Sequence, residues 1–211
     1  MTDAIQFLAK GGIIMYPLLL CSVIGLTVII EKLFSLRRGK ILIPEIISVV
    51  DTISSVQDIQ LATNICKKNK GPLAHIILTG LENESLPMDD IKKLINDEGR
   101  QQVRVLERGL PVLETVASIS PLLGLLGTVL GMIKVFTVIS TQGTGQASLL
   151  AGGISEALIT TATGLVIGIP LLVAYNYFTD RAENYILDIE KYSTKLLQKI
   201  REINTKPVES A

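Results

Sequence analysis

The sequence predicts an all-α membrane protein with three transmembrane helices, because its apolar residues are both abundant and gathered into long blocks. Hydrophobic residues make up 48% of the 211 residues, and the mean hydropathy is +0.46. A helix needs roughly 20 mainly apolar residues to cross about 30 Å of hydrocarbon. Lys+Arg and Asp+Glu balance at 20 each, so net charge does not point to a nucleic-acid partner.

Three blocks are long enough to span a bilayer. Residues 11–30 and residues 157–179 carry no charged side chain, and residues 115–139 carry only Lys134. With their flanking turns, the expected spans are 11–33, 112–139 and 152–179. The uncharged segment 140–148, rich in Gly, Ser, Thr and Gln, predicts a short turn that joins the last two spans in a helical hairpin.

The basic residues that flank the spans predict their orientation, since short loops rich in Lys and Arg stay in the cytoplasm. Lys10 is the only base before the first span. The bases on the opposite side are Arg37, Arg38, Lys40, Arg104, Arg108 and Arg181. We therefore expect a periplasmic N-terminus, an outer hairpin turn, and cytoplasmic regions at about 34–111 and 180–205.

Both cytoplasmic regions read as helical. Ser85 as a capping hydroxyl, Pro87 and the acids Asp89 and Asp90 predict the start of a helix. An imperfect apolar stripe follows, made by Ile91, Leu94, Ile95, Gln102, Val103 and Leu106. Gly109 and Pro111 should interrupt that helix before the second span.

After the third span, apolar and small residues recur at alternating steps of four and three. They are Ala182, Ile186, Ile189, Ser193, Leu196, Ile200 and Ile203. Such a seam packs either on the loop helices of its own chain or between subunits, and both interpretations stay open. We treat residues 1–211 as a single domain.

No catalytic constellation, cofactor motif or set of metal ligands stands out, so we do not expect an enzyme. Cys21 and Cys66 are expected to be small packing residues. His75, alone of its kind, is expected to be a packing histidine.

The informative residues are the polar and small ones inside the spans. Counting at about 1.5 Å per residue places Thr128 and Thr161 at matching depth near mid-membrane. A lone Thr in a span usually bonds to its own helix, whereas two at equal depth suggest a polar path. Because no Asp, Glu or His lies near that depth, a partner would have to supply any carboxylate that carries a proton.

Lys134 and Glu156 lie at similar shallow depths below the outer surface. Ionisable groups within spans pair with one another or face a cavity. The sequence leaves open whether these two form an ion pair or whether Lys134 extends to the interface.

Small residues predict close packing of the two hairpin arms. The glycines concerned are Gly124, Gly127, Gly131, Gly164 and Gly168. Pro121 and Pro170 predict kinks.

Long motifs in the sequence resemble the MotA/TolQ/ExbB proton-channel family, and most of all its ExbB and TolQ branch. One motif runs from Ile119 to Val129 and continues at Gly131, and another runs from Gly153 to Thr161. The likeness covers nearly the whole chain and is weakest in the cytoplasmic regions.

This resemblance implies the pore-forming subunit of a proton-motive-force-driven motor in the bacterial inner membrane. It implies a homo-pentamer around single-span partners of the ExbD or TolR kind, whose membrane Asp carries the proton. Force would pass to a TonB-like or TolA-like protein, with TonB-dependent import as the expected use. Carried over by motif, Thr128 and Thr161 line the lumen and Glu156 sits near its outer mouth.

Alternatives to this reading are a TolQ-type envelope-maintenance motor, a gliding motor, and a membrane scaffold that conducts nothing. A self-sufficient transporter is disfavoured, because such proteins need their own midplane binding group and usually have repeated halves.

Overall fold

The computed structural model describes residues 11–143 and 147–205, and all of its regular elements within these ranges are α-helices. In chain order they are α2 (Met15–Ser35), α3 (Arg38–Ile41), α4 (Pro44–Thr52), α5 (Val56–Lys68), α6 (Pro72–Glu82), α7 (Met88–Glu107), α8 (Leu110–Gln142) and α9 (Ala147–Thr205). Within the described residues, three helical stretches are long and apolar enough to cross a membrane. They contain α2, α8 and α9, which confirms an all-α protein with three candidate spans.

The chain divides into two compact units. The first, here called the hairpin unit, comprises Met1–Glu31 and Gly109–Tyr177. The second, here called the loop unit, comprises Lys32–Arg108 and Phe178–Ala211. The prediction of one domain over residues 1–211 stays a prediction.

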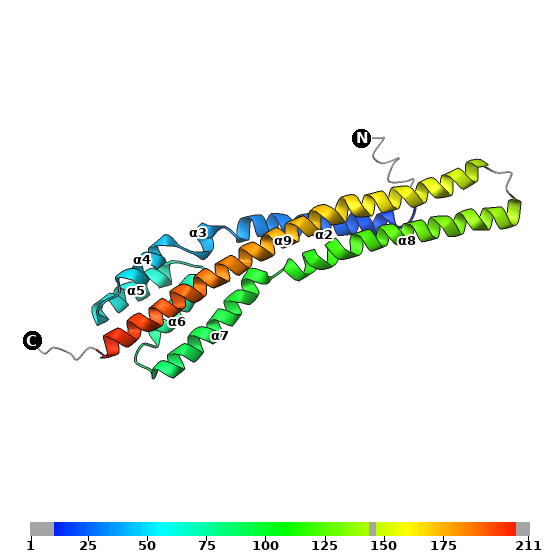
Figure 1. Ribbon diagram of the computed structural model, residues 1–211. Coiled ribbons are helices and arrows are strands. Elements are labelled where there is room, and N and C mark those ends of the chain that lie inside the picture. The colour runs from blue at the N-terminus through cyan, green and yellow to red at the C-terminus, as the bar shows by residue number, and fades with distance from the viewer. Residues whose placement is uncertain (1–10, 144–146, 206–211) are drawn as a thin grey trace, which may run out of the picture. The chain divides into compact units, whose positions relative to one another are not determined.

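In the hairpin unit α8 and α9 run antiparallel and form the predicted hairpin (Figure 1). Gly109, at φ +87°, separates α7 from α8, and a proline in the first turn of α8 follows it. This confirms the predicted interruption, since Gly adopts the left-handed conformation without a steric penalty. The other end of α8 is closed by the N–H of Gly143, which donates to the Ile139 carbonyl at 3.0 Å.

The turn of the hairpin is shorter than the predicted segment 140–148. Ser140 and Thr141 extend α8, and Ala147 and Ser148 already belong to α9. Thr141 Oγ1 donates to the Thr137 carbonyl at 2.8 Å, so this hydroxyl supports the helix instead of a turn. The central residues 144–146 lie outside the described part of the chain.

Helix α2 completes the hairpin unit and runs in the same direction as α9. The start of the described chain lies near Ile159, where a Cβ on Gly11 would be 3.4 Å from Ile159 Cγ2. Further along, a Cβ on Gly25 would be 2.6 Å from the Leu171 methyl groups. Alternating directions for α2, α8 and α9 are what three successive spans require.

Both α8 and α9 continue through Pro121 and Pro170, and the predicted kinks at these prolines stay predictions.

In the loop unit, the start of α7 differs from the prediction. The residue that precedes the helix is Pro87 and no side chain caps it, so Ser85 is not the cap. Pro87 occupies the N-cap position with a non-helical backbone conformation. Ser85 is two residues further from the helix, so its hydroxyl does not cap the first backbone N–H groups. The expected acids, Asp89 and Asp90, do occupy the first turn.

A capping box that the sequence analysis missed begins α5. The Ser55 hydroxyl accepts from the Asp58 N–H, and the Asp58 carboxylate accepts from the backbone N–H of Ser55 and of Ser54. These hydrogen bonds, that of Ser54 foremost, hold the pKa of Asp58 below its usual value. The serine followed three residues later by an acid is the signal that would have found this start.

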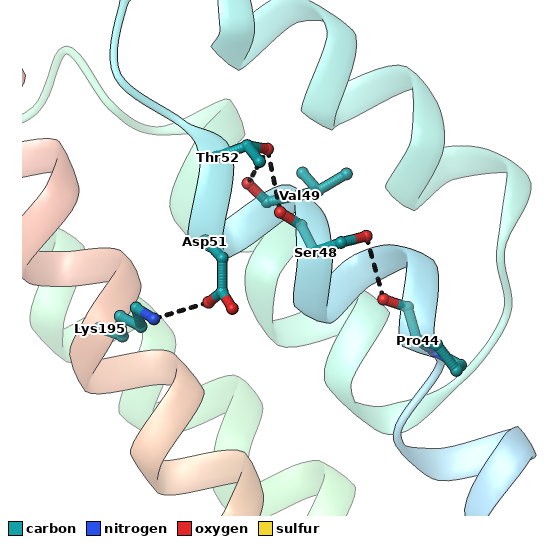
Figure 2. Close-up of polar contacts among 6 residues, drawn as sticks. All are labelled: Pro44, Ser48, Val49, Asp51, Thr52 and Lys195. Carbon is teal, nitrogen blue, oxygen red and sulfur yellow. Dashed lines mark hydrogen bonds and ion pairs between the residues drawn. The ribbon is translucent and has the colours of Figure 1, made fainter.

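The seam on the last part of α9 is buried within its own chain. Leu196 and Ile200 are fully buried, and a Cβ on Gly80 of α6 would be 2.7 Å from Leu196 Cδ2. Asp51 of α4 accepts a hydrogen bond from Lys195 of α9 at 2.7 Å (Figure 2). The intramolecular interpretation of the seam therefore holds in the loop unit, and the seam between subunits stays a prediction.

Cys66 is buried as expected, His75 is not, and Lys32 is a buried cation that the sequence analysis did not single out. Cys66 is buried, and burial raises the pKa of its thiol to about 11. His75, expected to be a packing histidine, is exposed, because the buried face of α6 is formed by Leu73, Ala74, Ile76 and Ile77. Lys32 is fully buried and donates to the Leu106 carbonyl at 2.8 Å, a favourable place for a cation because it is the C-terminal end of α7.

Candidate functional site

Glycines bring the backbones of α8 and α9 into close contact. A Cβ on Gly164 would lie 2.6 Å from the Ser120 carbonyl oxygen and 3.0 Å from Gly124 Cα. A Cβ on Gly131 would lie 2.8 Å from that of Ala157, and one on Gly168 would lie 2.7 Å from the ring of Pro121. Any larger residue at these positions would push the two helices apart, so these small residues determine the separation of the arms.

Thr161 links the two arms by a hydrogen bond. Its Oγ1 donates to the Gly124 carbonyl of α8 at 3.0 Å. Thr128 instead donates to the Leu125 carbonyl of its own helix at 2.6 Å. The two acceptors are consecutive residues of α8, so they differ by only about 1.5 Å along the helix axis. Both hydroxyls therefore lie at nearly the same level of the hairpin, as residue counting predicts.

The neighbouring hydroxyls have ordinary structural roles. Thr160 is fully buried and donates to Ala157 at 2.8 Å, while Thr163 donates to Ile159 at 2.8 Å. Ser120, which the sequence analysis did not single out, is also fully buried and donates to Val116 at 2.7 Å. All three bond to their own helix, whereas Thr161 bonds across the hairpin.

Lys134 and Glu156 form an ion pair between the arms. Lys134 Nζ lies 2.5 Å from Glu156 Oε1, and the two side chains are 58% and 22% exposed. Of the two possibilities that the sequence left open, the structure adopts the pair. The pair borders a hollow of about 510 Å³ between α8 and α9, whose lining includes Thr137, Ser148 and Gly152.

The ion pair and the paired hydroxyls occupy different levels of the hairpin. Glu156 precedes Thr161 by five residues on α9 and Lys134 follows Thr128 by six on α8, which corresponds to about 8 to 9 Å along the axis. The sequence places no Asp, Glu, His, Lys or Arg in residues 115–133 or 157–179. At the hydroxyl level, these segments of α8 and α9 therefore offer acceptors and donors of hydrogen bonds but no side chain that exchanges a proton near neutral pH.

Comparison with known proteins identifies the family. The MotA/TolQ/ExbB proton channel family matches residues 68–191, a segment that contains α8 and the first part of α9. Two of the similar proteins come from Synechocystis sp. The putative biopolymer transport protein ExbB-like 1 is 33% identical over 171 residues, which cover 79% of this chain and 66% of the relative. ExbB-like 3 is 30% identical over 170 residues, which cover 80% of this chain and 81% of the relative.

The TolQ branch is similar over a shorter segment. The Tol-Pal system protein TolQ of Pseudomonas aeruginosa is 47% identical over 81 residues, 38% of this chain and 35% of the relative. The family match extends over more than half of the 211 residues and the ExbB-like relatives match over most of them. The chain therefore belongs to the MotA/TolQ/ExbB proton channel family.

Proposed function

We propose that this chain is the pore-forming subunit of a motor driven by the proton-motive force in the bacterial inner membrane, with its N-terminus in the periplasm. The observation that carries the proposal is the pair of hydroxyls, Thr128 and Thr161, at one level of a hairpin whose sequence has no ionisable carboxyl at that level. Membership of a proton channel family supports this reading.

The role of each threonine follows from its hydrogen bond. A hydroxyl has one proton to donate and two lone pairs to accept. Thr161 gives its proton to Gly124 and Thr128 gives its proton to Leu125. Both oxygens thus keep lone pairs for a water molecule or for the proton of a neutral carboxylic acid. The two hydroxyls hydrate and orient an incoming carboxylic acid, and the proton itself is carried by that acid, not by the threonines.

The carboxylate comes from a partner under this proposal. The resemblance to ExbB and TolQ implies a homo-pentamer around a single-span protein of the ExbD or TolR kind, whose membrane Asp faces Thr128 and Thr161. Glu156 then stands near the outer mouth of the path. Proton flow is coupled to force on a periplasmic TonB-like protein, and TonB-dependent import is the use we favour, since two ExbB-like relatives match over most of this chain.

Proton uptake by liposomes tests the proposal. The chain is reconstituted with a single-span partner of the ExbD or TolR kind, and uptake is measured under an imposed proton gradient. We expect Thr128→Val and Thr161→Val to lower the uptake rate by about tenfold each, as a loss of about 1.4 kcal/mol at the barrier produces. Thr27→Val is the control matched to Thr128→Val, because Thr27, like Thr128, donates to a carbonyl of its own helix, but that helix is α2. Its uptake rate should equal that of the unmodified chain.

Two results would contradict different parts of the proposal. Unchanged uptake in both hairpin variants removes the threonines from the path, while the function stands. No uptake by the unmodified complex, although native mass spectrometry finds a pentamer with its partner bound, favours the scaffold that conducts nothing.

A further inference from the structure

Gly12 meets the carboxylate of Glu156 at the point where the described chain enters α2. Its φ of +68° lies in the left-handed region, which favours glycine. A Cβ at this position would also lie 2.8 Å from the carboxyl carbon of Glu156. The backbone conformation therefore favours glycine at residue 12, and a side chain there would force the end of the Glu156 side chain to move.

The turn that contains Gly12 follows the surface of α9. The Gly12 carbonyl accepts from the Met15 N–H at 3.2 Å, which begins the first turn of α2. Gly11, beside it, is buried and lies near Ile159, three residues after Glu156 on α9. The backbone of residues 11–12 thus covers one side of the Glu156 side chain.

The oxygen of Glu156 that faces Gly12 is the one that binds Lys134. Oε1 is the atom nearest to the position of a Gly12 Cβ, and Oε1 also lies 2.5 Å from Lys134 Nζ. The two ends of the ion pair differ in exposure, because Glu156 is 22% exposed and Lys134 is 58% exposed. The acidic end is covered by the turn, and the basic end faces the open side.

We propose that Gly12 is a positioning residue for Glu156. Because residue 12 has no side chain, the turn before α2 closes over the carboxylate and holds Oε1 on Lys134. This assignment connects all three helices of the hairpin unit through one carboxylate. Only its consequence for transport, control of Glu156 at the outer mouth, rests on the proposed function.

The reactivity of the Lys134 amine reports directly on this arrangement. The full-length protein, in membranes or detergent, is treated briefly with a water-soluble N-hydroxysuccinimide ester, and mass spectrometry measures the acylation rate of Lys134. Asn tolerates left-handed backbone better than most residues, so Gly12→Asn mainly tests the contact with the carboxylate. We expect this variant to acylate Lys134 about threefold faster, the size expected for loss of a partly exposed ion pair.

Gly152→Ala is the matched control. Gly152 lies on α9 four residues before Glu156, and a Cβ there meets nothing within 4 Å. Its Lys134 acylation rate should equal that of the unmodified chain. An unchanged rate in Gly12→Asn, with the control also unchanged, overturns the proposal.

A double-variant cycle shows whether the effect passes through Glu156. Glu156→Gln removes the charge but keeps the shape, so it should accelerate acylation by itself, and Gly12→Asn should add nothing to it. An equal acceleration by Gly12→Asn in the Gln background overturns the proposal, because residue 12 then acts without the ion pair.

The proposal can also be tested if Gly12→Asn fails to fold. If Gly12→Asn does not accumulate in the membrane, Glu156→Ala should restore accumulation, since it clears the space that the new Cβ needs. Failure of that double variant, while Glu156→Ala alone accumulates, overturns the proposal. None of these readouts requires proton flow, so the proposed function and this inference can fail separately.

Discussion

The Thr161 hydroxyl donates a 3.0 Å hydrogen bond to the Gly124 carbonyl across the hairpin. The contact is possible because Gly124 has no side chain, and a Cβ there would lie 3.0 Å from Thr161 Cα. The residue that we propose to line the path is thus also one that joins α8 to α9. Its two roles can be separated by experiment.

Thr161→Val should destabilise the hairpin slightly, because it removes the hydrogen bond from the Thr161 hydroxyl to the Gly124 carbonyl, which joins α9 to α8. Interhelical hydrogen bonds in membranes contribute about 0.6 kcal/mol on average. Unfolding in mixed micelles measures the loss. Thr163→Val is the control, since Thr163 bonds only to its own helix, and an equal loss in both variants would contradict the assignment of the cross-hairpin bond.

Exchange of the two charges tests the ion pair of the hairpin. Lys134→Glu and Glu156→Lys each place like charges together, so each single variant should be less stable than the unmodified protein. The double variant restores opposite charges and should recover about 0.2–1 kcal/mol, the range for exposed pairs. Assembly and unfolding of the four proteins are compared. A double variant no better than either single one would mean that the pair contributes nothing.

Gly164→Ala should destabilise the hairpin strongly. The new methyl group would lie 2.6 Å from the Ser120 carbonyl oxygen, and a backbone atom inside a helix cannot move away cheaply. Overpacking of this kind costs about 1–3 kcal/mol. The same exchange at Gly152, where the space is open, should be neutral or slightly stabilising, since Ala favours helices. Equal stability of the two variants would rule out close packing at Gly164.

The buried thiol of Cys66 predicts a pH dependence in the loop unit. Burial raises its pKa to about 11, from an ordinary value of 9.0. Because the folded state holds the thiol neutral, this contribution to stability is fully present below pH 9.0 and is lost as pH rises through about 11. Thermal unfolding of the unmodified protein and Cys66→Ala measures it, and the difference between them should shrink with rising pH. A difference that stays constant to the alkaline limit would contradict this origin.

Residue spacing predicted the membrane helices well because hydrocarbon imposes a simple rule. A span must satisfy its own backbone and present apolar side chains, so the uncharged blocks identify α2, α8 and α9 without tertiary information. The same regularity of rise per residue explains why counting placed Thr128 and Thr161 at one level. The glycines of the hairpin were equally readable, since close approach of helices in lipid requires small residues.

The ends of the helices and their capping residues were harder to predict from the sequence, because neighbouring residues offer alternative caps of similar free energy. Ser85 had the chemistry of a cap but Pro87 occupies that position, whereas Ser55 caps α5 with help from Asp58. The hairpin turn likewise lost residues to both helices, and on the α8 side Thr141 bonds back to Thr137.

The sequence by itself determined the membrane class, the three helices, the small-residue faces and the level of the two threonines. Only the tertiary structure decided which partner each polar group has: Gly124 for Thr161, Lys134 for Glu156, and Gly12 as the backbone that covers Glu156. The physical reason is range. Hydropathy and helical rise act between near neighbours in the chain, whereas these contacts join residues that are 22 to 144 positions apart and form only when whole helices pack.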